Sequence, residues 1–451
     1  MMQPWFPDAK LGIFIHYGIY AVLGITESWA FFHGEISYED YMKQLDGFTA
    51  SNYDPEDWAD LFEKAGARYA VLTTKHHDGV ALWDTKANDL SVVKKSPAKR
   101  DLITPYVEAL RRHNLKVGFY FSHLDWSHPD YATIRPLRDE SVGTATEHLK
   151  LDVNPFSAPP SDAETRDLFI KGKITLHEAM SRGVSPERWE NFLKFHRQQL
   201  RELCTDFGKI DLLWFDGDWE RTSSQFRMKE LREQLHQWQP EVILNSRMLG
   251  YGDYATPEQG MPMSPPDGPW EYCMTVNDSW GYQVQDHNHK TLRQIVRIFA
   301  ETIGMGGNLL LDVGPKEDGT ILPEQRERLL GLGNWIKKHE EAVFGTVAGL
   351  PHGHFYGAST ISKDRSKLYL IFFDKPIDGI AIRGLRNKVL KARVVGSGKE
   401  LATKRVGGAD WDHIPGILWV DVPESEIDSQ ATVVALELEG EIGLYQGTGR
   451  T

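Results

Sequence analysis

The chain has 451 residues, more than one hydrophobic core usually supports, so two domains are expected. Its formal net charge of −13 at pH 7 argues against a nucleic acid as partner. The hydrophobic content of 41% is typical of a globular protein, and no uncharged apolar run is long enough to span a membrane.

Strand-like and helix-like segments alternate through the first three-quarters of the chain. The predicted strands cover residues 11–17, 69–77, 116–122, 210–215, 242–246 and 308–313, and the predicted helices cover 54–66, 101–114, 185–204, 225–239, 290–303 and 323–339. This alternation predicts a parallel sheet in an α/β protein. No GxGxxG follows a strand, so a (β/α)8-like TIM barrel is favoured over a doubly wound sheet. An irregular eighth strand is then expected around 254–274.

Two stretches depart from this alternation. Residues 136–185 carry PFSAPPSD and little apolar periodicity, so they are expected to form an insertion in the barrel or an unstructured surface loop. Beyond residue 349, short strands follow one another without helices, at 368–373, 389–395, 417–422 and 433–438. The pattern therefore predicts a catalytic barrel over residues 1–348 and a C-terminal antiparallel β-sandwich over 349–451.

Catalytic groups of such barrels lie at the carboxyl ends of the strands. The polar residues and the tryptophan near the ends of the predicted strands are His16, His76, His77, Asp78, His123, Asp125, Asp216, Arg247, Glu258, Glu271 and Trp280. Carboxylates accompanied by histidines, an arginine and a tryptophan are typical of a glycoside hydrolase. That reaction needs one carboxylate as nucleophile or base and a second carboxyl group as acid.

Asp216 is the best-defined of these carboxylates because it ends the apolar run IDLLWF. A carboxylate in that position needs donors such as Arg247 or a histidine to stay ionised. The alternative is an ordinary turn or helix-capping aspartate. Glu258 and Glu271 are the two candidates for the acid, and either could instead be a structural glutamate.

A metal site is not expected. His76 and His77 are adjacent, so in an extended strand their side chains would point to opposite faces. The chain has no HExxH motif, and its two cysteines, Cys204 and Cys273, lie outside any CxxC pair. Hydrogen bonds to sugar hydroxyls are the favoured role of the histidines, the alternative being one core histidine beside an exposed one. No cofactor is predicted either.

Several longer motifs, in this order, resemble the family of α-L-fucosidases over roughly residues 4–345. They are WFPDAKLGIFIHYG (5–18), TTKHHDGVALWD (73–84), GFYFSHLDW (118–126), LLWFDGDW (212–219), TPEQ (256–259), WEYCMTVNDSWGY (270–282) and GGNLLLDVGPKEDG (306–319). The resemblance implies a retaining double displacement on terminal α-L-fucosides of oligosaccharides or glycoconjugates. It implies that Asp216 is the nucleophile and Glu258 the acid/base, with Glu271 as the second candidate.

The resemblance also implies a set of sugar-binding residues. These are His16, His76, His77, Tyr120, Trp214, Arg247, Glu271 and Trp280. Many members have a glutamate directly before a tryptophan in the first loop, where this chain has Ser28 followed by Trp29. Glu27 and Trp29 are therefore the candidates for sugar contacts from this loop.

Two other functions remain open. One is a glycosidase of the same architecture that acts on another sugar, such as an α-L-galactoside. The other is a carbohydrate-binding protein with an inactive barrel, which the presence of both carboxylates disfavours. No signal peptide is recognisable at the N-terminus, which fits a cytoplasmic protein or a secreted one whose leader has been removed.

Overall fold

The computed structural model describes residues 2–131, 134–137, 150–153, 173, 186–374 and 376–448. Its largest sheet is parallel, with the strand order β7-β6-β3-β2-β1-β9-β8. These strands are β1 (Leu11–Ile15), β2 (Tyr69–Lys75), β3 (Lys116–Ser122), β6 (Leu212–Asp216), β7 (Ile243–Leu244), β8 (Glu271–Thr275) and β9 (Asn308–Val313). Buried residues fill nearly every position of these strands, as expected for a parallel sheet covered on both faces.

An irregular segment at residues 254–258 closes the sheet into a barrel. Tyr254 pairs with Asn245, just after β7, while Ala255 and Glu258 make parallel bridges to Trp270 and Cys273 on the β8 side. The segment thus lies between β7 and β8, the two edge strands of the sheet, and takes the place of the eighth strand. The predicted (β/α)8-like barrel with an irregular member is therefore present, and Glu258 lies at the carboxyl end of that member.

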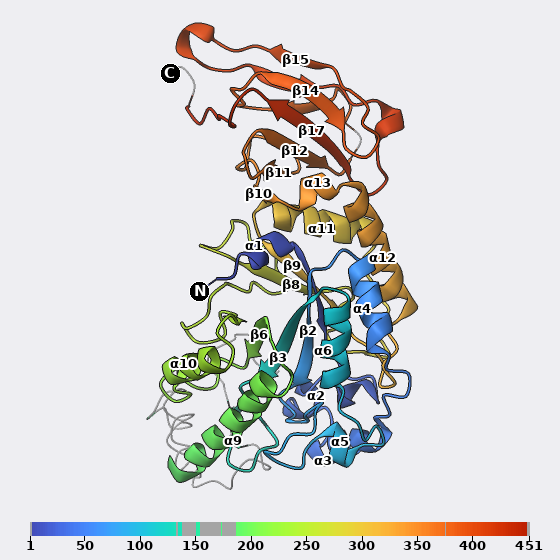
Figure 1. Ribbon diagram of the computed structural model, residues 1–451, viewed down its shortest axis with the longest axis vertical. Coiled ribbons are helices and arrows are strands. Elements are labelled where there is room, and N and C mark those ends of the chain that lie inside the picture. Colours follow the sequence, from blue (N-terminus) through green and yellow to red (C-terminus); the bar gives the residue numbers. More distant parts are fainter. Residues whose placement is uncertain are drawn as a thin grey trace.

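Helices cover the outside of the barrel (Figure 1). The longer ones are α4 (Pro55–Lys64), α6 (Ile103–Arg112), α9 (Pro186–Thr205), α10 (Met228–Trp238), α11 (Leu292–Gly304) and α12 (Pro323–Lys338). Helix α4 begins as the sequence predicts, because the Asp54 carboxylate accepts hydrogen bonds from the amides of Glu56 and Asp57. Its buried face, which includes Trp58 and Phe62, fastens the helix to the barrel.

Short helices occupy the segment before β1, the loops that follow β1 and β2, and the link to the C-terminal part. They are α1 (Trp5–Ala9), α2 (Trp29–Phe32), α3 (Tyr38–Met42), α5 (Val92–Lys95) and α13 (Glu340–Val343). Most of the predicted insertion at 136–185 lies outside the described residues. Its described part includes the antiparallel pair β4 (Ile134–Leu137) and β5 (Lys150–Val153).

The C-terminal part is an antiparallel β-sandwich, as predicted, and it lies at the opposite end of the molecule from α3 and α5 (Figure 1). One sheet has the order β10-β11-β12-β17-β14 and the other β13-β16-β15. The strands are β10 (Thr346–Ala348), β11 (Ala358–Ser362), β12 (Lys367–Phe372), β13 (Ile380–Ile382), β14 (Val389–Val394), β15 (Thr403–Val406), β16 (Ile417–Val420) and β17 (Thr432–Leu438). The division at residues 348/349 stays a prediction, and β10 pairs with the sandwich from just before it.

The five-stranded sheet is buried on both faces. Leu368 and Leu370 of β12 belong to the core between the two sheets, whereas Tyr369 and Ile371 belong to the core that the sheet shares with the barrel. Alternate residues of a strand point to opposite faces of the sheet. Because both faces of this sheet are buried, consecutive residues of β12 are apolar and its sequence is a continuous apolar run. Within the described part of the chain, no helix is long and apolar enough to cross a membrane.

Trp335 of α12 joins the barrel to the sandwich. It is 3% exposed, and its indole N–H donates to the carbonyl of Ala431 at 2.9 Å. Replacement by alanine is expected to lower the free energy of unfolding by about 3–5 kcal/mol, because a large cavity opens at the seam. Trp335→Phe keeps an aromatic ring and should lose only about 1 kcal/mol for the hydrogen bond. Denaturant unfolding followed by circular dichroism measures both, and an alanine variant as stable as the parent would contradict this role.

Candidate active site

A cavity of about 130 Å³ opens at the carboxyl end of the barrel. Its lining residues are Phe14, His16, Glu27, Trp29, His76, Tyr120, Trp214, Asp216, Trp219, Arg247, Glu258 and Trp280. All of these except Phe14 and Trp219 are candidate site residues from the sequence, so the fold gathers them at one place. The volume is well below the roughly 300–1,000 Å³ of sites for drug-sized ligands, and it suits a single sugar ring.

Arg247 lies between the two candidate catalytic carboxylates. Its Nη1 donates to Oδ1 of Asp216 at 2.6 Å, and its Nη2 donates to Oε2 of Glu258. Burial alone would lower the pKa of Arg247, but Asp216 and Glu258 outweigh burial and raise the pKa further. The guanidinium is therefore a permanent cation that binds one carboxylate with each of its two terminal nitrogens and so keeps the two carboxylates close together.

Two further groups face the other oxygen of Asp216. The Tyr120 hydroxyl donates to Oδ2 at 2.8 Å, and Nε2 of His77 lies 3.6 Å from the same oxygen. The aspartate itself is the last residue of β6, and its side chain is 14% exposed. Its carboxylate is thus aimed at the cavity by donors on neighbouring strands, which is how a nucleophile is kept in one orientation.

The two adjacent histidines lie on the same side of the barrel, contrary to the expectation that they diverge. Strand β2 ends at Lys75, so His76 and His77 belong to the turn that follows and the alternation of an extended strand does not apply to them. Their ring centroids are 4.3 Å apart. Only His76 lines the cavity, whereas His77 lies behind it against Asp216.

A serine hydroxyl lies at Nδ1 of each histidine. Ser28 is 2.6 Å from Nδ1 of His76 and also accepts from the amide of Asp78 at 2.9 Å. Ser122 is 2.6 Å from Nδ1 of His77 and also donates to the carbonyl of Leu124 at 2.9 Å. Burial lowers the pKa of both histidines well below the usual range, so both are neutral. The two serines thus hold the imidazole rings in place, with Nε2 of each ring on the side away from its serine.

Two further lining residues of the cavity, His16 and Glu27, are buried and have fixed partners. Nδ1 of His16 lies 2.6 Å from Oδ1 of Asp312 in β9, and Oε1 of Glu27 accepts from the amide of Gly281. Burial lowers the pKa of His16 and raises the pKa of Asp312 and of Glu27. Glu27 thus reaches the cavity from the first loop, while Ser28 next to it supports His76.

Glu271 lies beneath the cavity and does not line it. It begins β8, at the amino end of that strand, and it is fully buried. Tyr69 donates to its Oε2 at 2.5 Å, and the Trp214 indole donates to its Oε1 at 2.9 Å. Burial raises its pKa to about 7, against the two hydrogen bonds. Glu271 thus holds Trp214, which does line the cavity.

Three other strand-end residues named from the sequence do not line the cavity. Asp78 accepts from the Tyr41 hydroxyl, Asp125 pairs with the buried Lys75 at 3.2 Å, and His123 stacks on a core phenylalanine. They support the loops around the site. The described residues include no group of three or more histidine, cysteine or acidic residues that could hold a metal ion.

Phe14 and Trp219 also line the cavity, although they were not singled out from the sequence. Phe14 lies two residues before His16 on β1, so alternation places both on the inner face and could have identified it. Trp219 follows Asp216 by three residues, in a loop whose direction no local pattern reveals.

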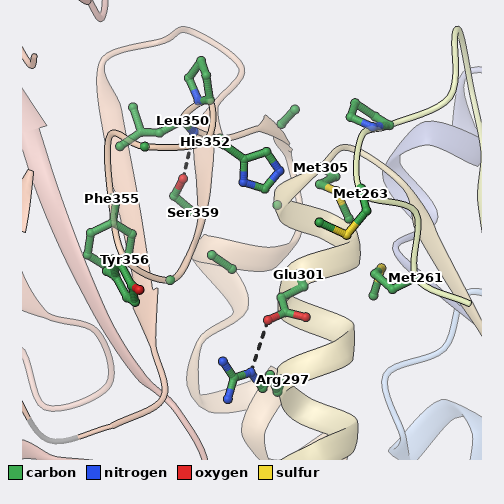
Figure 2. Close-up of a pocket in the computed structure, with 18 of the residues that line it drawn as sticks. Met261, Met263, Arg297, Glu301, Met305, Leu350, His352, Phe355, Tyr356 and Ser359 are labelled. Carbon is green, nitrogen blue, oxygen red and sulfur yellow. Dashed lines mark hydrogen bonds and ion pairs between the residues drawn. The ribbon is translucent and has the colours of Figure 1, made fainter. Parts of the chain in front are cut away.

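A larger cavity of about 750 Å³ lies between α11 and the segment before β11 (Figure 2). Figure 2 shows Met263 on one side of it and Phe355 and Tyr356 on the other. Among the described residues that line it, Glu301 is the only carboxylate, and it is paired with Arg297 at 3.2 Å. Glycoside hydrolysis needs two carboxyl groups, so the smaller cavity is the candidate active site despite its size.

The family model described as Alpha-L-fucosidase matches residues 1–341. The chain belongs to the α-L-fucosidase family. Tissue alpha-L-fucosidase of Homo sapiens is 31% identical over 415 residues, which cover 84% of this chain and 77% of that protein. The corresponding protein of Rattus norvegicus is 31% identical over 373 residues, covering 76% of this chain and 70% of its own.

Solved structures of α-L-fucosidases share the fold. The alpha-L-fucosidase isoenzyme 1 of Paenibacillus thiaminolyticus has a TM-score of 0.79 and 33% identity, covering 96% of this chain and 98% of that chain. The alpha-fucosidase of Thermotoga maritima, solved with a mechanism-based inhibitor, has a TM-score of 0.72 and 30% identity, with 96% of each chain covered. Both similarities extend over the barrel and the sandwich together.

The raised pKa of Glu271 makes stability depend on pH. Its folded-state pKa of about 7 lies above the usual glutamate value of 4.5, so the folded state binds the proton more tightly. The contribution of Glu271 to the free energy of unfolding is therefore fully present below pH 4.5, and about 3 kcal/mol of it is lost as the pH rises from 4.5 through 7. Glu271→Gln should remove this part of the pH dependence. Urea unfolding of both proteins at pH 5 and pH 8 measures it, and identical pH dependence would contradict the assignment.

Proposed function

We propose that this protein is a retaining α-L-fucosidase that hydrolyses terminal α-L-fucosides of oligosaccharides or glycoconjugates. The strongest support is that Asp216 and Glu258 each accept a hydrogen bond from a different terminal nitrogen of Arg247, at a cavity large enough for one monosaccharide. A retaining pair of carboxyl groups is separated by about 5–5.5 Å, a spacing that a shared guanidinium accommodates. Membership of the α-L-fucosidase family supports the same conclusion.

In the first step, Asp216 attacks the anomeric carbon and the bond to the leaving oxygen breaks. Glu258 gives its proton to that oxygen, so the leaving group departs as a neutral alcohol. In the second step, Glu258 takes a proton from a water molecule, the water oxygen attacks the anomeric carbon, and the ester bond to Asp216 breaks. Two inversions give net retention of configuration.

The surroundings of the two carboxylates suit these different roles. Asp216 is held by Arg247 and Tyr120, which donate to its two carboxylate oxygens and keep it aimed at the cavity. Glu258 is more open, with 36% of its side chain exposed. It can therefore turn away from Arg247 toward the leaving oxygen, which has to lie at the open side of the cavity.

The lining favours a 6-deoxy sugar. Phe14 packs against Trp214 and Trp280 at centroid distances of 5.0 and 5.9 Å, which gives an aromatic wall for the methyl group. His16, His76 and Glu27 supply polar atoms for the hydroxyls. An α-L-galactoside carries an extra hydroxyl where fucose has a methyl hydrogen, and burying it without a partner is unfavourable. Nitrophenyl glycosides of both sugars would separate these two functions.

Asp216→Gly is expected to lower kcat on a nitrophenyl α-L-fucoside by at least about 10³-fold, because the covalent step is lost. Azide should restore turnover by occupying the vacated space, and the product should be the β-fucosyl azide, since only one inversion then occurs. Product analysis by NMR is the measurement. Unchanged hydrolysis by the variant would contradict the nucleophile assignment.

Glu258→Gln and Glu271→Gln form a matched pair of charge-removing substitutions. The first should lower kcat/KM by about 10²-fold or more on substrates with a poor leaving group, and much less on fucosyl fluoride, which needs no proton. The second changes a glutamate beneath the cavity and should alter kcat/KM only a few-fold. Steady-state kinetics on both substrates checks this. The reverse order of effects would transfer the acid/base role to Glu271.

A further inference from the structure

Three polar side chains are connected to one another behind the end of β6. Nδ1 of His123 lies 3.1 Å from Nε2 of His196, and Nδ1 of His196 lies 2.8 Å from Nη1 of Arg197. Both histidines are 0% exposed. Nη2 of Arg197 donates to the carbonyl of Phe226, which anchors the far end of this set. All three residues lie outside the lining of the catalytic cavity, and we refer to them as the histidine chain.

The hydrogen positions in the histidine chain follow from Arg197. A guanidinium can only donate, so Nδ1 of His196 accepts from Arg197 and carries no hydrogen. Burial lowers the pKa of His196 well below its usual range and lowers the pKa of His123 to about 3, so both rings are neutral. The hydrogen of His196 is therefore on Nε2, which donates to Nδ1 of His123. That leaves the hydrogen of His123 on its own Nε2.

His123 contacts the backbone that carries the proposed nucleophile and its arginine. Its amide donates to the carbonyl of Asp216 at 2.8 Å, and its ring stacks on Phe215 with a centroid distance of 4.5 Å and an interplanar angle of 6°. Burial lowers the pKa of His123, whereas a hydrogen bond with the backbone of Arg247 raises it. Nε2 of His123 has no other hydrogen-bond partner among the described residues. The ring thus lies against both halves of the Asp216–Arg247 pair.

Side chains hold the end of β6 because its main-chain pairing with β7 stops early. Strand β7 pairs with β6 only at Leu212 and Leu213. Beyond them, the side-chain amide of Asn245 makes two hydrogen bonds of 2.9 Å to the backbone of Phe215. The next residue, Asp216, is held by the amide of His123 from the other side. The position of the Asp216 carboxylate therefore depends on the position of His123.

We propose that His196 and Arg197 are positioning residues for the reaction, because they fix the orientation of His123 and through it the place of Asp216 beside Arg247. This inference rests on the proposed fucosidase function. A shift of the nucleophile by about 1 Å lengthens its approach to the anomeric carbon, so the covalent step slows. The other lining residues still bind the sugar, so affinity for it is retained.

The test is the rate at which 2-deoxy-2-fluoro-fucosyl fluoride labels the enzyme. His196→Phe keeps a ring of similar size and leaves Nδ1 of His123 without its donor. The rate constant at saturating reagent should fall about tenfold or more, while the half-saturating concentration should stay within about twofold. A first-order rate constant does not depend on how much of a variant is folded, so a loss of stability alone would not change it.

Three further variants complete the design. The amide of His196→Gln offers both an acceptor for Arg197 and a donor for His123, so this variant should recover most of the rate constant. Arg197→Met leaves both rings in place and removes only the group that fixes their hydrogens, so a smaller fall of about threefold is expected. His339→Phe is the matched control, at a buried histidine whose Nδ1 bonds to the carbonyl of Trp335 in α12. It should leave the rate constant unchanged.

Each outcome has a separate meaning. An unchanged rate constant in His196→Phe, or one that His196→Gln does not recover, would overturn the proposal. An equal fall in His339→Phe would also overturn it, because the loss of any buried histidine would then slow labelling. If His196→Phe does not fold, Arg197→Met decides in the same way. If the parent enzyme is neither labelled nor active on fucosides, the proposed fucosidase function itself fails.

Discussion

The site depends on one arginine that neutralises two carboxylates. Arg247 reaches Asp216 with one nitrogen and Glu258 with another, and its guanidinium lies 4.9 Å from the centre of the Trp214 ring. Without this cation, two carboxylates at a partly buried cavity would repel each other. The planar guanidinium also sets their separation, which a lysine could not do in the same way.

Parallel strands explain how residues so distant in sequence meet there. Asp216 ends β6, Arg247 follows β7, and Glu258 ends the irregular segment that closes the barrel. Because these strands are parallel, their carboxyl ends lie at the same end of the barrel, and the three side chains meet there. The C-terminal sandwich does not contribute to the cavity, and it buries one face of its five-stranded sheet against the barrel. This arrangement fits a role in stabilising the barrel.

Much of this arrangement was predictable. The positions of Asp216 and Arg247 follow from apolar runs that end in polar residues, whereas Glu258 follows from the resemblance of its TPEQ motif to the α-L-fucosidases. The helices have recognisable starts, such as Asp54 before Pro55. Strand ends were harder. The run 69–77 predicts a strand through His77, whereas β2 ends at Lys75, so the predicted divergence of His76 and His77 is wrong. Glu271 precedes the run YCMTV and begins β8, so its prediction as a strand-end residue is wrong. Its place beneath the cavity depends on contacts with Tyr69 and Trp214 from other strands.

The features that escaped prediction share a physical reason, which is that they depend on contacts across the fold. The ring positions of His76 and His77 depend on hydrogen bonds with Ser28 and Ser122, which lie far from the histidines in sequence. Trp219 faces the cavity because of the turn at Gly217 and its packing on Trp29. All four residues of strand β15 are exposed, so its sequence has no alternation of apolar and polar residues from which a strand could be predicted.

The most direct test of the account is to trap the covalent intermediate. Incubation with 2-deoxy-2-fluoro-fucosyl fluoride slows both steps and lets the ester accumulate, and peptide mapping by mass spectrometry then identifies the labelled residue. The account predicts a single fucosyl label on the peptide that contains Asp216. A label on Glu258, or on any other residue, would contradict it.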